Sequence, residues 1–78
     1  MDRQQFSAIL PYISSDLVAL IAERRDLSDP EATQVLYSSK LYEALEDEAT
    51  KVWQYSTPML YHLLEQEEKT GLIQFPDV

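Results

Sequence analysis

Residues 28–45 read SDPEATQVLYSSKLYEAL, and this stretch decides the fold class because it carries two helix starts in succession. Ser28 supplies a hydroxyl cap, and Pro30 follows in the first turn. Glu31 stands three residues after Ser28, which completes the pattern of a capping box. The residues that then recur at helical spacing and mark a buried face are Ala32, Val35 and Leu36. The pattern predicts an amphipathic helix that begins at Ser28.

Two serines, Ser38 and Ser39, follow this helix and either end it or cap the next one. A short apolar pattern at helical spacing comes next, formed by Leu41, Tyr42 and Leu45. The carboxylates between Glu43 and Glu48 repel one another at a helix C-terminus, where the helix dipole already disfavours negative charge. We therefore predict a second, short helix that breaks near Asp47.

The segment before this stretch, residues 4–25, carries an apolar stripe at intervals of three and four residues. The stripe consists of Phe6, Leu10, Ile13, Leu17, Leu20 and Ile21, and the residues assigned to the opposite face are Ser7, Ser14, Glu23 and Arg24. Pro11 is discordant, because a proline inside a helix removes one hydrogen bond and clashes with the preceding turn. Either the helix starts near Leu10 or it is kinked at Pro11. We favour a short N-terminal turn followed by a helix over residues 11–25.

The last helix start is the sequence STP at residues 56–58, in which either of the first two side chains serves as the cap. We expect a helix from Pro58 to about Lys69, with Gly71 as its C-terminal cap. Its apolar face is formed by Leu60, Tyr61, Leu63 and Leu64. The tail, residues 72–78, is too apolar to be purely solvated, so it either packs back on the helices or contacts a partner.

One stretch, residues 52–55, favours an extended backbone because it holds Val52, Trp53 and Tyr55. The chain has a single glycine, so tight hairpins are scarce. We therefore predict an all-α fold, a small bundle of three to four helices with a short extended segment near residues 52–55. The length allows one domain, residues 1–78. Its predicted core consists of Leu10, Ile13, Leu17, Leu20, Ile21, Val35, Leu36, Leu41, Leu45, Leu60 and Leu64.

The net charge of −8 and the lack of cysteine restrict the function classes. Nucleic acids carry dense negative charge, so direct binding of DNA or RNA is disfavoured, whereas a basic protein partner is compatible with the charge. Without cysteine the chain has neither a disulfide nor a thiolate metal site. The apolar run over residues 17–22 is far short of a membrane span, and Asp2 and Arg3 do not begin a signal peptide. We expect a cytoplasmic protein that binds no membrane.

The sequence lacks a constellation of residues that would carry catalysis. His62 is the one histidine, and a metal site would need a second ligand of that kind at helical spacing. The acidic run between Glu43 and Glu48 lacks the glycine and the ligand spacing of a calcium loop, so it reads as a solvated acidic corner. We therefore predict no catalytic residue, no metal ligand and no cofactor, and we expect that the protein is not an enzyme.

The aromatic residues are the most informative for function. Tyrosine and tryptophan are favoured both in thin cores with a wet edge and in interface hot spots. A domain of this size cannot bury five tyrosines and one tryptophan fully, so we expect some of these rings on the surface. The predicted partner-binding residues are Tyr42, Trp53, Tyr55 and Phe75.

Residues 36–53, LYSSKLYEALEDEATKVW, and residues 56–61, STPMLY, resemble short bacterial helical proteins of unknown function, some of which are encoded beside toxin-like partners. The shared pattern is tyrosine, serine, tyrosine, leucine, an acid, a threonine and then a serine-proline helix start. The resemblance covers residues 9–67, and Thr57 separates the serine from Pro58, a departure that leaves the cap intact. It implies a bacterial cytoplasmic helical protein with a partner-binding role, and it transfers no catalytic residue.

Small size, acidic charge, clustered aromatics and this resemblance together predict a protein-interaction or regulatory module, with an antitoxin-like role as one form of it. The alternative is a homo-oligomeric structural protein, in which the apolar tail and the first helix pack across a two-fold axis.

Overall fold

The computed structural model describes residues 3–71, which form four α-helices and two 3-10 turns and contain no strand. The elements in chain order are α1 (Arg3–Arg25), α2 (Asp29–Tyr37), α3 (Lys40–Glu46), η1 (Glu48–Thr50), η2 (Val52–Gln54) and α4 (Thr57–Thr70). The predicted all-α bundle is confirmed for this part of the chain. The tail, residues 72–78, and with it Phe75, lies outside the described residues.

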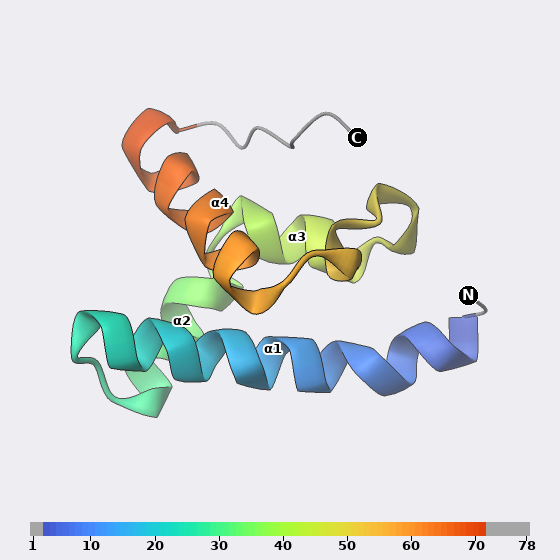
Figure 1. Ribbon diagram of the computed structural model, residues 1–78, viewed down its shortest axis with the longest axis horizontal. Helices are drawn as coiled ribbons and strands as arrows, with labels where there is room; N and C mark the ends of the chain where they lie inside the picture. The colour runs from blue at the N-terminus through green and yellow to red at the C-terminus, as the bar shows by residue number, and fades with distance from the viewer. Residues whose placement is uncertain (1–2, 72–78) are drawn as a thin grey trace.

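The long helix α1 lies along one side of the molecule, and α2 and α4 pack onto it (Figure 1). Helices α2 and α4 both contact α1, while α3 contacts α2 and α4. The core lies where these helices meet and consists of Leu17, Ile21, Ala32, Leu36, Leu41, Leu45, Val52, Leu60, Tyr61, Leu63 and Leu64. The predicted core residues that are only half-buried against it are Leu10, Ile13, Leu20 and Val35.

Helix α1 runs without interruption through Pro11, so the prediction that the helix begins at residue 11 is wrong. The proline cannot donate the hydrogen bond to the Ser7 carbonyl, and a proline inside a helix costs about 3 kcal/mol. Phe6 offsets this loss, because its ring is buried and meets the Trp53 ring edge-on, with 5.9 Å between centroids. Burial of a phenylalanine contributes about 1.5–3 kcal/mol. A tertiary contact therefore holds the two turns that precede the proline.

Helix α3 ends near Asp47 as predicted, and the same residue begins the next turn. Asp47 Oδ1 accepts a hydrogen bond from the backbone N–H of Ala49 at 3.0 Å and so caps η1. Lys51 then adopts a left-handed backbone, with φ at 58°, and redirects the chain from η1 into η2.

The extended segment predicted near residues 52–55 is wrong for its first three residues, because Val52–Gln54 forms the turn η2. This turn buries Val52 in the core and lets Trp53 Nε1 donate to the Glu48 carbonyl at 3.0 Å. These contacts outweigh the preference of valine and tryptophan for strands. The last residue of the segment alone keeps an extended backbone.

The predicted caps of α2 and α4 are confirmed. Ser28 Oγ accepts from the Glu31 N–H at 3.3 Å, and Glu31 Oε1 accepts from the Ser28 N–H at 3.1 Å. The cap of α4 is Ser56, whose hydroxyl accepts from the Met59 N–H at 3.3 Å. Gly71 ends α4 in a left-handed conformation, with φ at 75°.

The start of α3 is capped by two different elements. Ser39 Oγ accepts from the Tyr42 N–H at 3.1 Å. The Glu67 carboxylate, which comes from α4, accepts from the backbone N–H groups of Lys40 at 2.8 Å and Leu41 at 2.9 Å. Because α3 has only seven residues, it depends on such contacts with its neighbours.

Arg25 connects the C-terminal end of α1 to α4 through side-chain contacts. Its guanidinium forms an ion pair with Glu68, in which Nη1 donates to Oε2 at 2.8 Å, and its Nε donates to the Tyr61 hydroxyl at 3.2 Å. The guanidinium carbon also lies 5.4 Å from the centroid of the Tyr61 ring, within the range of a cation–π contact.

By length and composition alone, the Gln4–Arg25 stretch of α1 would suffice to cross a membrane. The core helix of a globular domain meets the same criterion. In the folded chain Leu17 and Ile21 are fully buried against the other helices, while 22% of the apolar stretch as a whole is buried.

A candidate interaction surface on α1 and α2

Two aromatic side chains remain exposed in the described part of the chain. Tyr12 on α1 is 73% exposed, and Tyr37 at the end of α2 is 56% exposed. Every other large hydrophobic side chain described is buried or half-buried. An exposed apolar patch marks an interaction site mainly when it is contiguous. The residues that lie between Tyr12 and Tyr37 therefore decide whether the two rings belong to one site.

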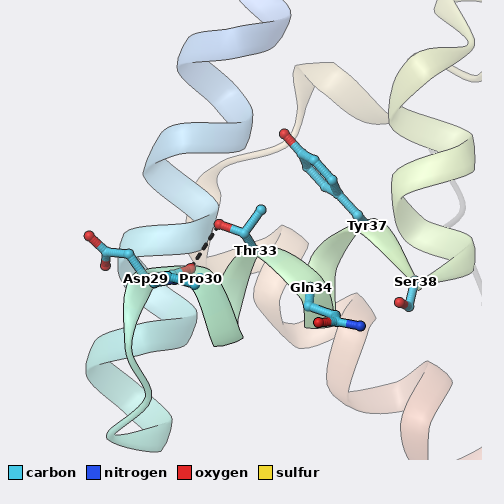
Figure 2. A pocket seen from close by; sticks show the side chains of 6 residues that line it. All are labelled: Asp29, Pro30, Thr33, Gln34, Tyr37 and Ser38. Carbon is cyan, nitrogen blue, oxygen red and sulfur yellow. Dashed lines mark hydrogen bonds between the residues drawn. The ribbon is translucent and has the colours of Figure 1, made fainter.

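The outer face of α2 carries a shallow, open depression, which we call the first groove (Figure 2). It is lined by Asp29, Pro30, Thr33, Gln34, Tyr37 and Ser38. The groove exists because α2 buries fully only Ala32 and Leu36, so that no other part of residues 3–71 covers the opposite side of this short helix. Thr33 Oγ1 donates to the Asp29 carbonyl at 2.8 Å and is satisfied within the helix.

A second groove, of about 350 Å³, lies where α1, α2 and α3 meet. It is lined by Leu10, Pro11, Ser14, Ser15, Val18, Thr33, Tyr37 and Tyr42. Thr33 and Tyr37 line both grooves, so these two side chains form the ridge between them. Figure 2 shows the Tyr37 ring directed away from α2, toward the space between α1 and α3. Tyr12 does not line the second groove; it lies three residues before Ser15 on α1, one turn from the edge of the groove. We call Tyr12 and the lining residues of both grooves the interaction surface.

The Tyr37 ring stacks on the Tyr42 ring, with 4.5 Å between centroids and 30° between planes. Burial raises the pKa of the Tyr42 phenol, and the neighbouring Tyr37 phenol and Glu46 carboxylate act in the same direction. Tyr42 therefore stays protonated well above neutral pH.

Ser14 is the unusual residue of this surface. Its side chain is only 7% exposed, and its hydroxyl forms no well-aligned hydrogen bond among the described residues. The hydroxyl lies beside the Tyr42 phenol, and its hydrogen-bonding contact with that phenol lowers the pKa of Tyr42, which opposes the effect of burial. The predicted place of Ser14 on the polar face of the first helix is wrong, because Ser14 lies four residues after Leu10 and three before Leu17 and therefore shares their buried face.

The electrostatic character of the interaction surface is neutral to negative. Neither groove is lined by a lysine, an arginine or a histidine. Asp29 lines the first groove, and Asp16 is exposed on α1 one turn after Tyr12. The whole chain has 14 acidic and 6 basic residues. An anionic ligand would find no countercharge here.

The residues predicted to bind a partner are separated by the fold. Tyr42 reaches the second groove, but it is half-buried and not exposed. Trp53 is half-buried between Phe6 and the Glu48 carbonyl, and Tyr55 is half-buried against the core. Phe75 lies outside the described residues.

Sequence reasoning missed Tyr12 and Tyr37 as candidates. A signal for Tyr12 was present, because this residue lies off the apolar stripe of the first helix and would face away from the core. Tyr37 carried no such signal. His62 is exposed on α4, and no group of three or more potential metal ligands occurs within residues 3–71.

Comparison with known proteins gives no significant match: no family model, no curated protein and no solved structure is similar to the chain. The case for a function therefore rests on the residues and their geometry.

Proposed function

We propose that this protein is a helical interaction module that docks a basic protein partner on the interaction surface of α1 and α2. The observation that carries the proposal is the exposure of Tyr12 and Tyr37 beside two adjoining grooves that no basic residue lines. Tyrosine is enriched in interface hot spots because its large ring is rigid and its hydroxyl remains satisfied in water or in a complex.

Charge complementarity selects the partner. A partner with lysine and arginine around an apolar stripe would place its apolar side chains in the grooves and its cations near carboxylates such as Asp16 and Asp29. Two copies of this chain, each with a net charge of −8, repel each other. A heterologous basic partner therefore fits the surface better than self-association does.

The shape of the surface favours an amphipathic helix as the docking element. The ridge of Thr33 and Tyr37 separates the two grooves, and a helix laid across it would set side chains on both sides. Such an arrangement suits a protein that restrains a second protein by covering it, as an antitoxin does. Binding would also add stability to a domain whose core is small.

The test begins with capture of partners on the tagged chain from its own cells, followed by binding measurements on the purified proteins. We expect a double variant, Tyr12→Ser with Tyr37→Ser, to weaken partner binding at least tenfold. The matched control is His62→Ser, which removes an exposed ring on α4 outside both grooves and should leave the affinity unchanged.

Affinity should also fall when salt is raised from about 0.05 M to about 0.5 M, because exposed charges are screened over a shorter distance. A partner that binds the double variant as tightly as the wild type would place the interface elsewhere. Recovery of the chain with itself alone, together with a dimeric or larger mass by light scattering, would support the homo-oligomer instead.

A further inference from the structure

The second groove continues along α1 into an acidic pocket, whose lining residues are Phe6, Ser7, Leu10, Glu46, Asp47 and Glu48. Leu10 lines both the second groove and the acidic pocket, so the two share a wall on α1. They are also joined on α3, because Tyr42 and Glu46 lie four residues apart on one face of that helix. The first groove, the ridge of Thr33 and Tyr37, the second groove and the acidic pocket therefore follow one another in this order.

The acidic pocket differs from both grooves in its charge. It is lined by three carboxylates and by no lysine, arginine or histidine. Asp47 Oδ1 already accepts the Ala49 N–H, whereas Glu46 and Glu48 form no ion pair within residues 3–71. Glu46 is exposed and Glu48 is half-buried, and a cation placed between them would reduce the repulsion between the two carboxylates.

The lining of the pocket indicates the kind of cation. Within residues 3–71 no three carboxylates or histidines are arranged to hold a metal ion. Phe6 is buried and Leu10 is half-buried, so they give the pocket an apolar wall beside its carboxylates. Arginine and lysine side chains bury their methylene stems against apolar surface and keep the charged head group free for a carboxylate. The pocket therefore fits the cationic side chain of a basic protein better than a metal ion.

We infer that the acidic pocket sets the direction of the partner's helix: an apolar side chain enters the second groove, and an arginine or lysine about two turns along the same helix enters the acidic pocket. The spacing follows from α1, because the residues that line the second groove, 10–18, and those that line the pocket, 6–10, have midpoints about six residues or ~9 Å apart. Two helical turns, about seven residues, cover ~11 Å and return to the same face. This inference rests on the proposed function and names the orientation of the partner and one of its contact residues.

The first test removes charge from the pocket. The double variant Glu46→Gln with Glu48→Gln should bind the purified partner about fivefold more weakly than the wild type, and its affinity should depend less steeply on salt. Fewer carboxylates at the C-terminal end of α3 suit the helix dipole, so this variant keeps its fold. The matched control is Glu23→Gln with Glu43→Gln, which changes the net charge equally at exposed positions outside the pocket and both grooves. Equal affinities of the two double variants would assign the effect to net charge and overturn the inference.

The second test fills the pocket from within the chain. Ser7 is exposed and lines the acidic pocket, whereas the neighbouring Ala8 is exposed and lines neither the pocket nor a groove. Ser7→Arg should place a guanidinium among the carboxylates and weaken partner binding about fivefold more than Ala8→Arg, which adds the same charge nearby. Equal losses of affinity in these two variants would contradict a cation site in the pocket.

A double-mutant cycle identifies the cation of the partner. Each lysine and arginine of its docking helix is replaced by glutamine. One replacement should weaken binding to the wild type about fivefold and leave binding to the Glu46 and Glu48 double variant nearly unchanged, because both changes remove the same contact. That cation should lie about seven positions from an apolar residue whose replacement by alanine also weakens binding. Losses of affinity that add for every lysine and arginine would overturn the inference.

The inference and the proposed function fail in different ways. Partner binding that is lost in the Tyr12 and Tyr37 double variant but survives the changes to the acidic pocket would overturn the orientation and keep the docking surface. Partner binding that is lost in Ser7→Arg but unchanged in the Tyr12 and Tyr37 double variant would overturn the proposed docking surface and keep the cation pocket.

Discussion

At the scale of single residues, the Ser14 hydroxyl makes a direct prediction about stability. Because the buried hydroxyl forms no well-aligned hydrogen bond among the described residues, and because alanine is the better helix former, Ser14→Ala should raise the free energy of unfolding by about 1 kcal/mol. Urea unfolding followed by circular dichroism measures this change. Ser15→Ala, at the exposed neighbouring position, should stay within about 0.5 kcal/mol of wild type. A loss of stability in Ser14→Ala would mean that the hydroxyl is satisfied.

Trp53 acts as a structural residue in this fold. Trp53→Ala removes the ring that covers Phe6 and should lower the free energy of unfolding by about 3 kcal/mol. Trp53→Phe keeps a ring there but loses the hydrogen bond from Nε1 to the Glu48 carbonyl, so we expect a cost of about 1 kcal/mol. Thermal unfolding of both variants measures which of the two is less stable. Equal stability of Trp53→Ala and wild type would contradict the packing at this end of α1.

Residue types pointed to aromatic contacts, but spacing alone did not show which rings remain exposed. Tyr42 on α3 packs against Tyr37, and Trp53 on η2 packs against Phe6, so both rings are half-buried. Such contacts between segments cannot be predicted from the residue spacing within one segment. The burial of Ser14, by contrast, follows from its spacing, because it lies four residues after Leu10 and three before Leu17 on the same face of α1.

At the scale of elements, the capping box of α2 predicts a dependence on pH. Hydrogen bonds from the backbone and the hydroxyl of Ser28 lower the pKa of Glu31 below its ordinary value of 4.5. A carboxyl group with a lowered pKa stabilises the fold above its ordinary pKa, and this stabilisation is lost as the pH falls through the lowered value. The melting temperature should therefore decline more steeply below about pH 4.5 in the wild type than in Glu31→Gln, which keeps a capping side chain without a charge. Parallel curves for the two proteins would show that the contact has no effect on stability.

The carboxylate of Glu67 makes the start of α3 depend on α4. Glu67→Ala leaves the N–H groups of Lys40 and Leu41 without their acceptor, and it should lower the free energy of unfolding by about 1–3 kcal/mol. Glu65→Ala, on the same helix, is the control and should have a small effect. Urea unfolding measures the free energy of unfolding of both variants. Equal losses of this free energy in the two variants would contradict a specific cap by Glu67.

Local signals predicted the helix ends well where the cap lies within a few residues of the helix. Ser28, Asp47 and Gly71 all act at the predicted positions. Predictions failed where a distant contact decided the backbone. Pro11 is tolerated because Phe6 reaches Trp53, and residues 52–55 turn inward because Val52 is buried.

At the scale of the whole molecule, the all-α class followed from a chain with one glycine and several helix starts. The open outer face of α2 within residues 3–71 did not follow, because it depends on where α1 and α3 pack against that helix. The charge of the chain acts at this scale too. It disfavours a second copy of the chain and favours a basic partner.

The most direct test of the central claim is the NMR chemical-shift map of the ¹⁵N-labelled chain with its purified partner. The account predicts a footprint over residues 10–18 of α1 and residues 29–38 of α2, with the amide of Tyr42 included and α4 largely unperturbed. A footprint centred on α4, or on the acidic corner between Glu43 and Glu48, would contradict it.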